Sequence, residues 1–215
     1  MSERSCFYGG VGKGDETRSA VLDEAMRMVS AIGMRGLTIG SLAERTNMSK
    51  SGLFGHFKSK EQLQLDVLDH AAELFVDLVL RPALKAPRGE PRVRELFERK
   101  LIWDGLQYGA DGALPGGCIF TNLATELDDE PDGPLRDKLV RHERDWHEVV
   151  ATVFAGGISE GHFDPSYDPV QFAYDLHGVM LAHHYATRLM RDPDAERRAR
   201  NSFESLLRAA RVVQP

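Results

Sequence analysis

Residues 37–60, which read LTIGSLAERTNMSKSGLFGHFKSK, hold two short helical patterns on either side of a tight turn. Thr38 and Ser49 stand where the two helices begin, and a hydroxyl group there caps a helix by accepting a backbone N–H hydrogen bond. Asn47 falls in the turn and tolerates a left-handed backbone. Two short helices joined in this way form a helix-turn-helix unit, whose second helix enters the major groove of DNA. The stretch therefore predicts a DNA-binding element.

The second helix of this unit carries three apolar residues and two residues that are expected to point outward. Leu53, Phe54 and Phe57 are its apolar residues, whereas Lys50 and His56 are expected to point outward. Outward basic and polar side chains are the groups that contact phosphates and base edges.

The same stretch resembles the DNA-binding signature of the TetR family of bacterial transcriptional regulators. That signature is a Thr, a short helix, a turn and then Ser-Lys-x-x-Leu-Tyr-x-His-Phe-x-Ser-Lys. The matching residues here are Thr38, Ser49, Lys50, Leu53, His56, Phe57, Ser59 and Lys60. The resemblance implies an all-α fold of about nine helices, in which a three-helix DNA-binding domain precedes a larger helical domain for ligand binding and dimerisation.

The recognition helix departs from the signature at three positions. Phe54 replaces the usual Tyr, and Gly52 and Gly55 replace larger residues. Each glycine lowers the stability of the helix by about 1 kcal/mol relative to Ala. Readout of bases is therefore expected to depend on Lys50, Ser51 and His56, or on close approach of the backbone. The residues predicted to bind DNA are Thr38, Ser49, Lys50, Ser51, Gly52, Phe54, Gly55, His56 and Lys60.

Charge is distributed unevenly along the chain, whose net charge is −6. Residues 1–60 hold 9 Lys and Arg against 6 Asp and Glu, and residues 61–215 hold 18 against 27. The basic excess thus coincides with the predicted DNA-binding element, as phosphate contact requires.

Composition indicates the cellular compartment of the protein. The two cysteines, Cys6 and Cys118, make no disulfide framework, and no apolar run approaches the ~18 residues of a membrane span. No secretory signal precedes the first helix. We expect a cytoplasmic protein without a membrane partner.

Three segments are expected along the chain. Residues 1–14 are glycine-rich and lack periodicity, so they are interpreted as a flexible arm. The stretch GGVGKG is not a P-loop, because it lacks the required Ser or Thr and a preceding strand. Residues 15–60 form the DNA-binding domain and residues 61–215 the effector-binding and dimerisation domain.

Apolar spacing predicts the helices of these segments and no strands. The first runs from about Asp15 to Ile32 and ends at Gly33, and a long helix from Lys60 ends near Arg81-Pro82, because proline interrupts the hydrogen-bond ladder. The remaining expected helices span residues 92–108, 118–127, 135–158, 169–190 and 194–212.

The last two helices are expected to pair with those of a second subunit, as in the family. A two-fold dimer would place two recognition helices on half-sites about one DNA turn apart. The residues predicted at this interface are Leu176, Val179, Ala186, Phe203, Leu206 and Leu207.

An effector pocket is expected among the C-terminal helices, since pockets between helices are mostly apolar with a few polar groups. The residues predicted to line it are Trp103, Phe120, Thr121, Trp146, Val150, His177, Met180 and His184. The alternative interpretation is that these aromatics and histidines are ordinary core or interface residues.

Histidine spacing predicts no metal site, and no nucleophile, base and orienting group stand at a recognisable spacing, so we expect no cofactor and no catalytic centre. His142 and His147 are five residues apart and leave a common helical face, and His177 and His184 are about 10 Å apart along their helix. We therefore predict a ligand-responsive repressor, not an enzyme, that binds a near-palindromic operator as a homodimer and is released by a small, largely apolar molecule. A DNA-binding regulator without a small-molecule ligand and a small helical enzyme are the alternatives.

Overall fold

A computed structural model describes residues 13–105 and 117–212, which form helices apart from one isolated bridge between Phe163 and Arg211. The elements are α1 (Lys13–Gly36), α2 (Ile39–Thr46), α3 (Lys50–His56), α4 (Lys60–Phe75), a π-helical segment η1 (Val76–Leu80), α5 (Arg81–Lys85), α6 (Glu90–Asp104), α7 (Ile119–Leu127), α8 (Pro134–Ser159), α9 (Pro169–Arg188) and α10 (Ala195–Ala210). The all-α prediction is confirmed. Most of the expected flexible arm, residues 1–12, lies outside the described residues.

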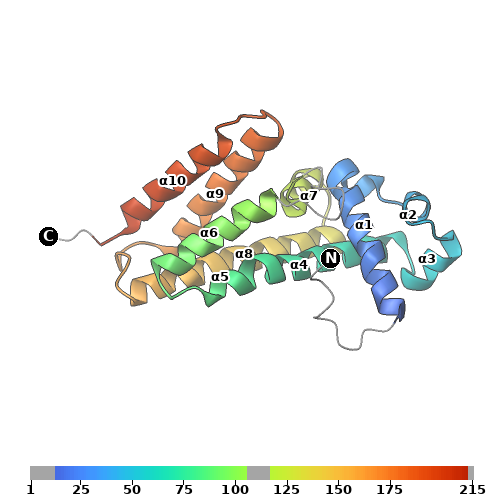
Figure 1. Ribbon diagram of the computed structural model, residues 1–215, viewed down its shortest axis with the longest axis horizontal. Coiled ribbons are helices and arrows are strands. Elements are labelled where there is room, and N and C mark those ends of the chain that lie inside the picture. Colours follow the sequence, from blue (N-terminus) through green and yellow to red (C-terminus); the bar gives the residue numbers. More distant parts are fainter. Residues whose placement is uncertain (1–12, 106–116, 213–215) are drawn as a thin grey trace, which may run out of the picture.

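The helices form an elongated molecule with two ends (Figure 1). The head, α1–α3, lies at one end, and α4 leads from it along the molecule beside α8. The body, α6–α10, forms the remainder, with α9 and α10 packed together as a hairpin. Among the described residues, no helix combines the length and apolar character needed to span a lipid bilayer.

Gly33 interrupts the regular part of α1, as its position in the sequence predicts. Its φ of 76° and ψ of 170° are not helical, and a side chain at this position would meet the carboxylate of Glu126. That carboxylate of α7 accepts hydrogen bonds from the backbone N–H groups of Met34 and Arg35, at 2.8 and 2.7 Å. The end of α1 is thus held by a residue far away in the sequence.

The long helix from Lys60 does not end near Arg81-Pro82, where the sequence predicts that it ends. Helical backbone continues through η1 and α5 to Lys85. The π-helical segment directly before Pro82 widens the turn that the proline ring would otherwise crowd, and the Arg81 N–H donates to the Val76 carbonyl, five residues back. The chain thereby absorbs the proline without a break.

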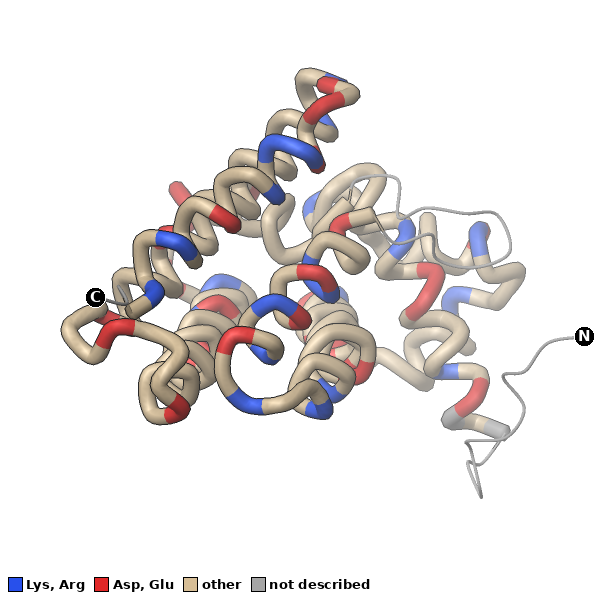
Figure 2. The backbone as a smooth tube through the Cα atoms, turned by 60° about the vertical axis from the view of Figure 1, so that its left-hand side comes forward, with Lys and Arg blue, Asp and Glu red and all other residues tan. Residues whose placement is uncertain are grey.

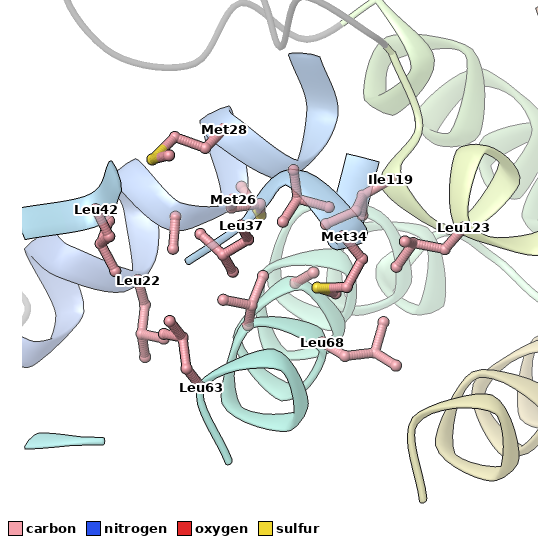
Figure 3. Packing of buried hydrophobic residues seen from close by; sticks show 14 of the residues in the cluster. Leu22, Met26, Met28, Met34, Leu37, Leu42, Leu63, Leu68, Ile119 and Leu123 are labelled. Carbon is pink, nitrogen blue, oxygen red and sulfur yellow. The ribbon is translucent and has the colours of Figure 1, made fainter. Parts of the chain in front are cut away.

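Buried apolar residues form two clusters, and the boundary between them does not follow the boundary between head and body. The seam cluster joins the head to α4 and α7, and Figure 3 shows Leu22, Met26 and Leu42 of the head beside Leu63 and Leu68 of α4 and Leu123 of α7. The distal cluster joins α5, α6, α8, α9 and α10. Trp146 and Leu80 pack against both clusters. Burial of this kind contributes about 25 cal/mol per Å² of apolar surface, so head and body stabilise each other.

Candidate DNA-binding and ligand-binding sites

Local side-chain caps fix the geometry of the helix-turn-helix unit. The Thr38 hydroxyl accepts from the Ser41 N–H at 3.0 Å, and the Ser41 hydroxyl accepts from the Thr38 N–H at 3.1 Å. Ser49 caps α3 by accepting from the Gly52 N–H at 3.0 Å. Asn47 adopts the left-handed conformation, with φ 53° and ψ 32°. Both expected caps and the expected turn are therefore present.

One face of α3 is open to solvent. Lys50, Ser51 and Gly55 are exposed, His56 is half-buried, and Leu53 and Phe57 are fully buried beneath them. Phe54, one of the residues predicted to bind DNA, lies on the open face with 52% of its surface exposed. A large exposed aromatic on a recognition helix is available for contact with a DNA groove.

The two glycines of α3 occupy different surroundings. A Cβ atom at Gly52 would lie 3.1 Å from the Ser49 hydroxyl oxygen, which leaves little room beside the cap. A Cβ atom at Gly55 would meet nothing within 4 Å. Because Gly55 has no side chain and lies in open space, the backbone of α3 can be approached closely by a partner at this position. Lys60, expected to bind phosphate, donates to the Arg35 carbonyl at 3.3 Å.

A cavity of about 130 Å³ lies between α4, η1, α6, α7, α8 and α9. Its wall is mostly apolar and includes Phe75, Trp146 and Met180. Five of the eight residues predicted for the effector pocket line it, namely Phe120, Thr121, Trp146, His177 and Met180. Its position is at the boundary of the two clusters, since Trp146 packs against both.

The other three predicted pocket residues have different neighbours. The Trp103 indole is buried and donates to the Cys118 sulfur at 3.4 Å. Val150 faces the distal cluster. The His184 imidazole lies 3.2 Å from the Asn122 side-chain oxygen. Helical spacing places these residues on nearby turns but does not determine which neighbouring helix each one meets.

Sequence analysis missed a buried ion pair at this cavity. The Lys100 ammonium, which lines the cavity, donates to the carboxylate of Asp104 one turn later. Burial opposes the charged form of Lys100, but Asp104, Cys118 and Glu143 together favour that form, and the net effect is a raised pKa of the lysine. The signal in the sequence was the position of Lys100 between Phe97 and Leu101 on the apolar side of α6.

Burial also shifts the titration of the acid and the imidazoles near the cavity. It raises the pKa of the Glu143 carboxyl, and it lowers the pKa of His177 to about 4, with His147 and Lys100 lowering it further. Burial lowers the pKa of His147 as well. Both imidazoles are therefore neutral near pH 7.

The residues predicted for the dimer interface are largely used within one chain. Leu176, Phe203 and Leu207 are buried in the distal cluster, which makes their side chains unavailable to a partner; Val179, Ala186 and Leu206 are half-buried. The large exposed apolar residues of α9 and its C-cap lie four or seven positions apart, and we name them the α9 stripe: Val170, Tyr174, Leu181, Tyr185 and Leu189. Three of the six predicted residues are thus buried within their own chain, and for Leu176 the reason is that α9 is apolar around much of its girth.

Charged residues cover the outer surface of α10. Figure 2 shows acidic and basic residues interspersed along the α9–α10 hairpin. Arg200 forms ion pairs with Glu98 of α6 and Glu196 of α10, and Arg94 of α6 pairs with Glu204. These pairs hold α10 against α6 at the surface.

Two family models match the chain. The model for bacterial regulatory proteins of the tetR family matches residues 21–67, and the model for the tetracyclin repressor-like C-terminal domain matches residues 89–203. The class C tetracycline repressor protein of Escherichia coli is 43% identical over 54 residues, which are 25% of this chain and 24% of that protein. The matches to the curated relatives span about a quarter to a third of their length.

Solved structures share the fold over nearly the whole chain. A TetR-family regulator from Cytophaga hutchinsonii has a TM-score of 0.78 at 22% identity, covering 96% of this chain and all of that one. The structure of AibR with isovaleryl coenzyme A and operator DNA has a TM-score of 0.66 at 19% identity, covering 89% of this chain and 98% of that one.

Proposed function

This chain belongs to the TetR family of bacterial transcriptional regulators, and we propose that it is a ligand-responsive repressor that binds a near-palindromic operator as a homodimer. The observation that carries the proposal is the open face of α3, which stands over a buried base of Leu53 and Phe57. We place DNA contacts on Lys50, Ser51 and His56, with Phe54 positioned for apolar contact with a thymine methyl group.

Two copies of the chain are proposed to meet through the α9 stripe. Tyr174 and Leu189 are each about two-thirds exposed, and a stripe of large apolar residues in water marks an interaction surface. A two-fold axis through α9 and α10 would bring each stripe against its own copy. The paired recognition helices would then contact half-sites about one turn, or 34–36 Å, apart.

The cavity is the proposed effector site. Its volume of about 130 Å³ resembles that of engineered apolar cavities of about 150 Å³, which bind benzene. The effector is therefore expected to be a small, largely apolar molecule, or a larger one whose apolar end enters the cavity. AibR, which shares the fold, is known with both isovaleryl coenzyme A and operator DNA. The cavity counts against the alternative of a regulator with a filled core.

Two elements connect this cavity to the head. Phe75 lines the cavity on α4, the helix that begins directly after α3. Thr121 lines it on α7, whose Glu126 holds the backbone at the end of α1. An effector that displaces α4 or α7 would change the spacing of the two heads. Effector and DNA binding would then oppose each other by linkage.

Fluorescence anisotropy tests the proposal with purified full-length protein and labelled DNA from immediately upstream of its gene. A scrambled duplex of equal length is the control, and all titrations share one salt concentration. We expect tight, salt-sensitive binding to the upstream duplex only. Equal weak binding to both duplexes, and to tiled fragments of the neighbouring intergenic DNA, would contradict it.

A further inference from the structure

Glu143, His147 and His177 bring one carboxylate and two imidazoles together where α8 packs against α9. One ligand atom from each lies within 4.8 Å of the others, and the two imidazole centroids are 4.6 Å apart. Glu143 and His147 are four residues apart and share one face of α8. His177 reaches them from α9. Sequence spacing did not reveal this group, because its third member comes from another helix.

These three side chains are not engaged in hydrogen bonds or ion pairs within residues 13–105 and 117–212. None of them forms a hydrogen bond or an ion pair with another described residue, although each side chain is partly buried. Polar side chains in such surroundings are normally satisfied by a partner. An imidazole nitrogen of each histidine and a carboxylate oxygen of Glu143 are the ligand atoms that the group offers.

We propose that Glu143, His147 and His177 bind a divalent transition-metal ion of the zinc type. Two imidazoles and one carboxylate are a ligand set that zinc uses in proteins, with a fourth position left for water. Ligand atoms around one zinc ion at about 2.0–2.2 Å stand about 3.4 Å apart. The observed separations thus require only small side-chain rotations. Backbone positions are already set by the packing of Val150 and Phe154 against Leu176 and Phe172.

Lys100 is the basic group that faces this site from α6, and Asp104 already balances its charge. Glu143 and Lys100 both line the cavity, and the lysine ammonium donates to the Asp104 carboxylate. A bound cation therefore meets a neutral pair together with the Glu143 carboxylate. The ion would link α8 to α9, and binding to the folded state alone would raise the melting temperature.

Titration of the full-length, metal-stripped protein with Co²⁺ tests the proposal, because the intensity of visible d–d absorption distinguishes four-coordinate from six-coordinate cobalt. We expect one Co²⁺ per chain with intense absorption, displacement by Zn²⁺, and a higher melting temperature with either ion. Glu143→Gln and His177→Ala should each weaken binding about 100-fold or more, since groups that merely orient a ligand already contribute 10–100-fold.

His142→Ala is the matched control, because His142 lies on α8 beside the same cavity but outside the cluster. It should retain binding. Circular dichroism of each stripped variant establishes that it is folded, and Glu143→Gln preserves the side-chain shape. Absent binding, hexahydrate-like absorption, or binding that survives both substitutions would overturn the proposal. The readout is metal binding alone, so the result does not depend on whether the protein binds an operator.

Discussion

The head and the body hold their functional side chains in different ways. In the head, caps at Thr38 and Ser49 lie within three residues of the groups that they bind, so the position of each α3 residue follows from its neighbours in sequence. In the body, Glu143 and His177 meet only because α8 packs on α9. The comparison shows that local hydrogen bonds position the side chains proposed to read DNA, whereas tertiary packing brings together those proposed to bind ligands.

The two regions nevertheless share one set of buried contacts. The seam cluster runs from Leu22 and Met26 in α1 through α4 to Trp103 and Leu123. The proposed effector, bound at the boundary of this cluster, would therefore act on the contacts that hold the head. The following predictions test how far head and body are separate.

Phe57→Ala should have the largest effect. Phe57 is fully buried in the seam cluster, and loss of a buried Phe side chain costs about 3–5 kcal/mol. Denaturant unfolding should shift equally when followed by circular dichroism and by the fluorescence of Trp103 and Trp146 in the body. An unmoved tryptophan transition would show that the head unfolds independently.

Lys50→Ala should affect the head alone. Lys50 is exposed on the open face of α3, and loss of a good base contact costs about 1–3 kcal/mol of DNA affinity. If the lysine contacts phosphate instead, the salt dependence of binding should fall by about one charge. Lys85→Ala, an exposed lysine at the end of α5, is the control and should bind as the parent does. Unchanged affinity and salt dependence in Lys50→Ala would remove this residue from the interface.

Glu126→Ala should weaken the connection between the two regions. Its carboxylate accepts two backbone hydrogen bonds from the end of α1, and their loss should lower the free energy of unfolding by about 1–2 kcal/mol. Glu130→Ala is the matched substitution, because the Glu130 carboxylate pairs with the largely exposed Arg35 side chain and its loss should change stability by less than about 1 kcal/mol. Equal effects of the two substitutions would contradict the role of Glu126.

Glu90→Gln should have the smallest effect, confined to the body and to acid pH. A hydrogen bond from Arg211 lowers the pKa of Glu90 most, burial raises it, and a hydrogen bond from Arg94 lowers it further. The net result is a fall from the ordinary value of 4.5 to about 2. A lowered pKa stabilises the fold above about pH 4.5, and that contribution is lost as pH falls through 2. Solvent screening limits it to about 1 kcal/mol or less. Glu90→Gln should flatten acid unfolding between those values, and an unaltered acid profile would contradict the assignment.

The sequence predicted the helix-turn-helix unit almost residue by residue, because its caps and its Asn47 turn depend on chemistry within a few positions. It also predicted most helices of the body to within a few residues. It could not predict the group of Glu143, His147 and His177, because its third member comes from another helix. Nor could it show that η1 accommodates Pro82, or that Glu126 of α7 holds the end of α1. Such features depend on helices that are distant in sequence.

Selection of binding sites from random DNA by the purified protein tests the central claim most directly. The claim is that paired α3 helices read a near-palindromic operator. It predicts enrichment of a two-fold symmetric sequence whose half-site centres lie about 10–10.5 base pairs apart. Enrichment should disappear with Lys50→Ala combined with His56→Ala. Recovery of no preferred sequence, or of one half-site without symmetry, would contradict the claim.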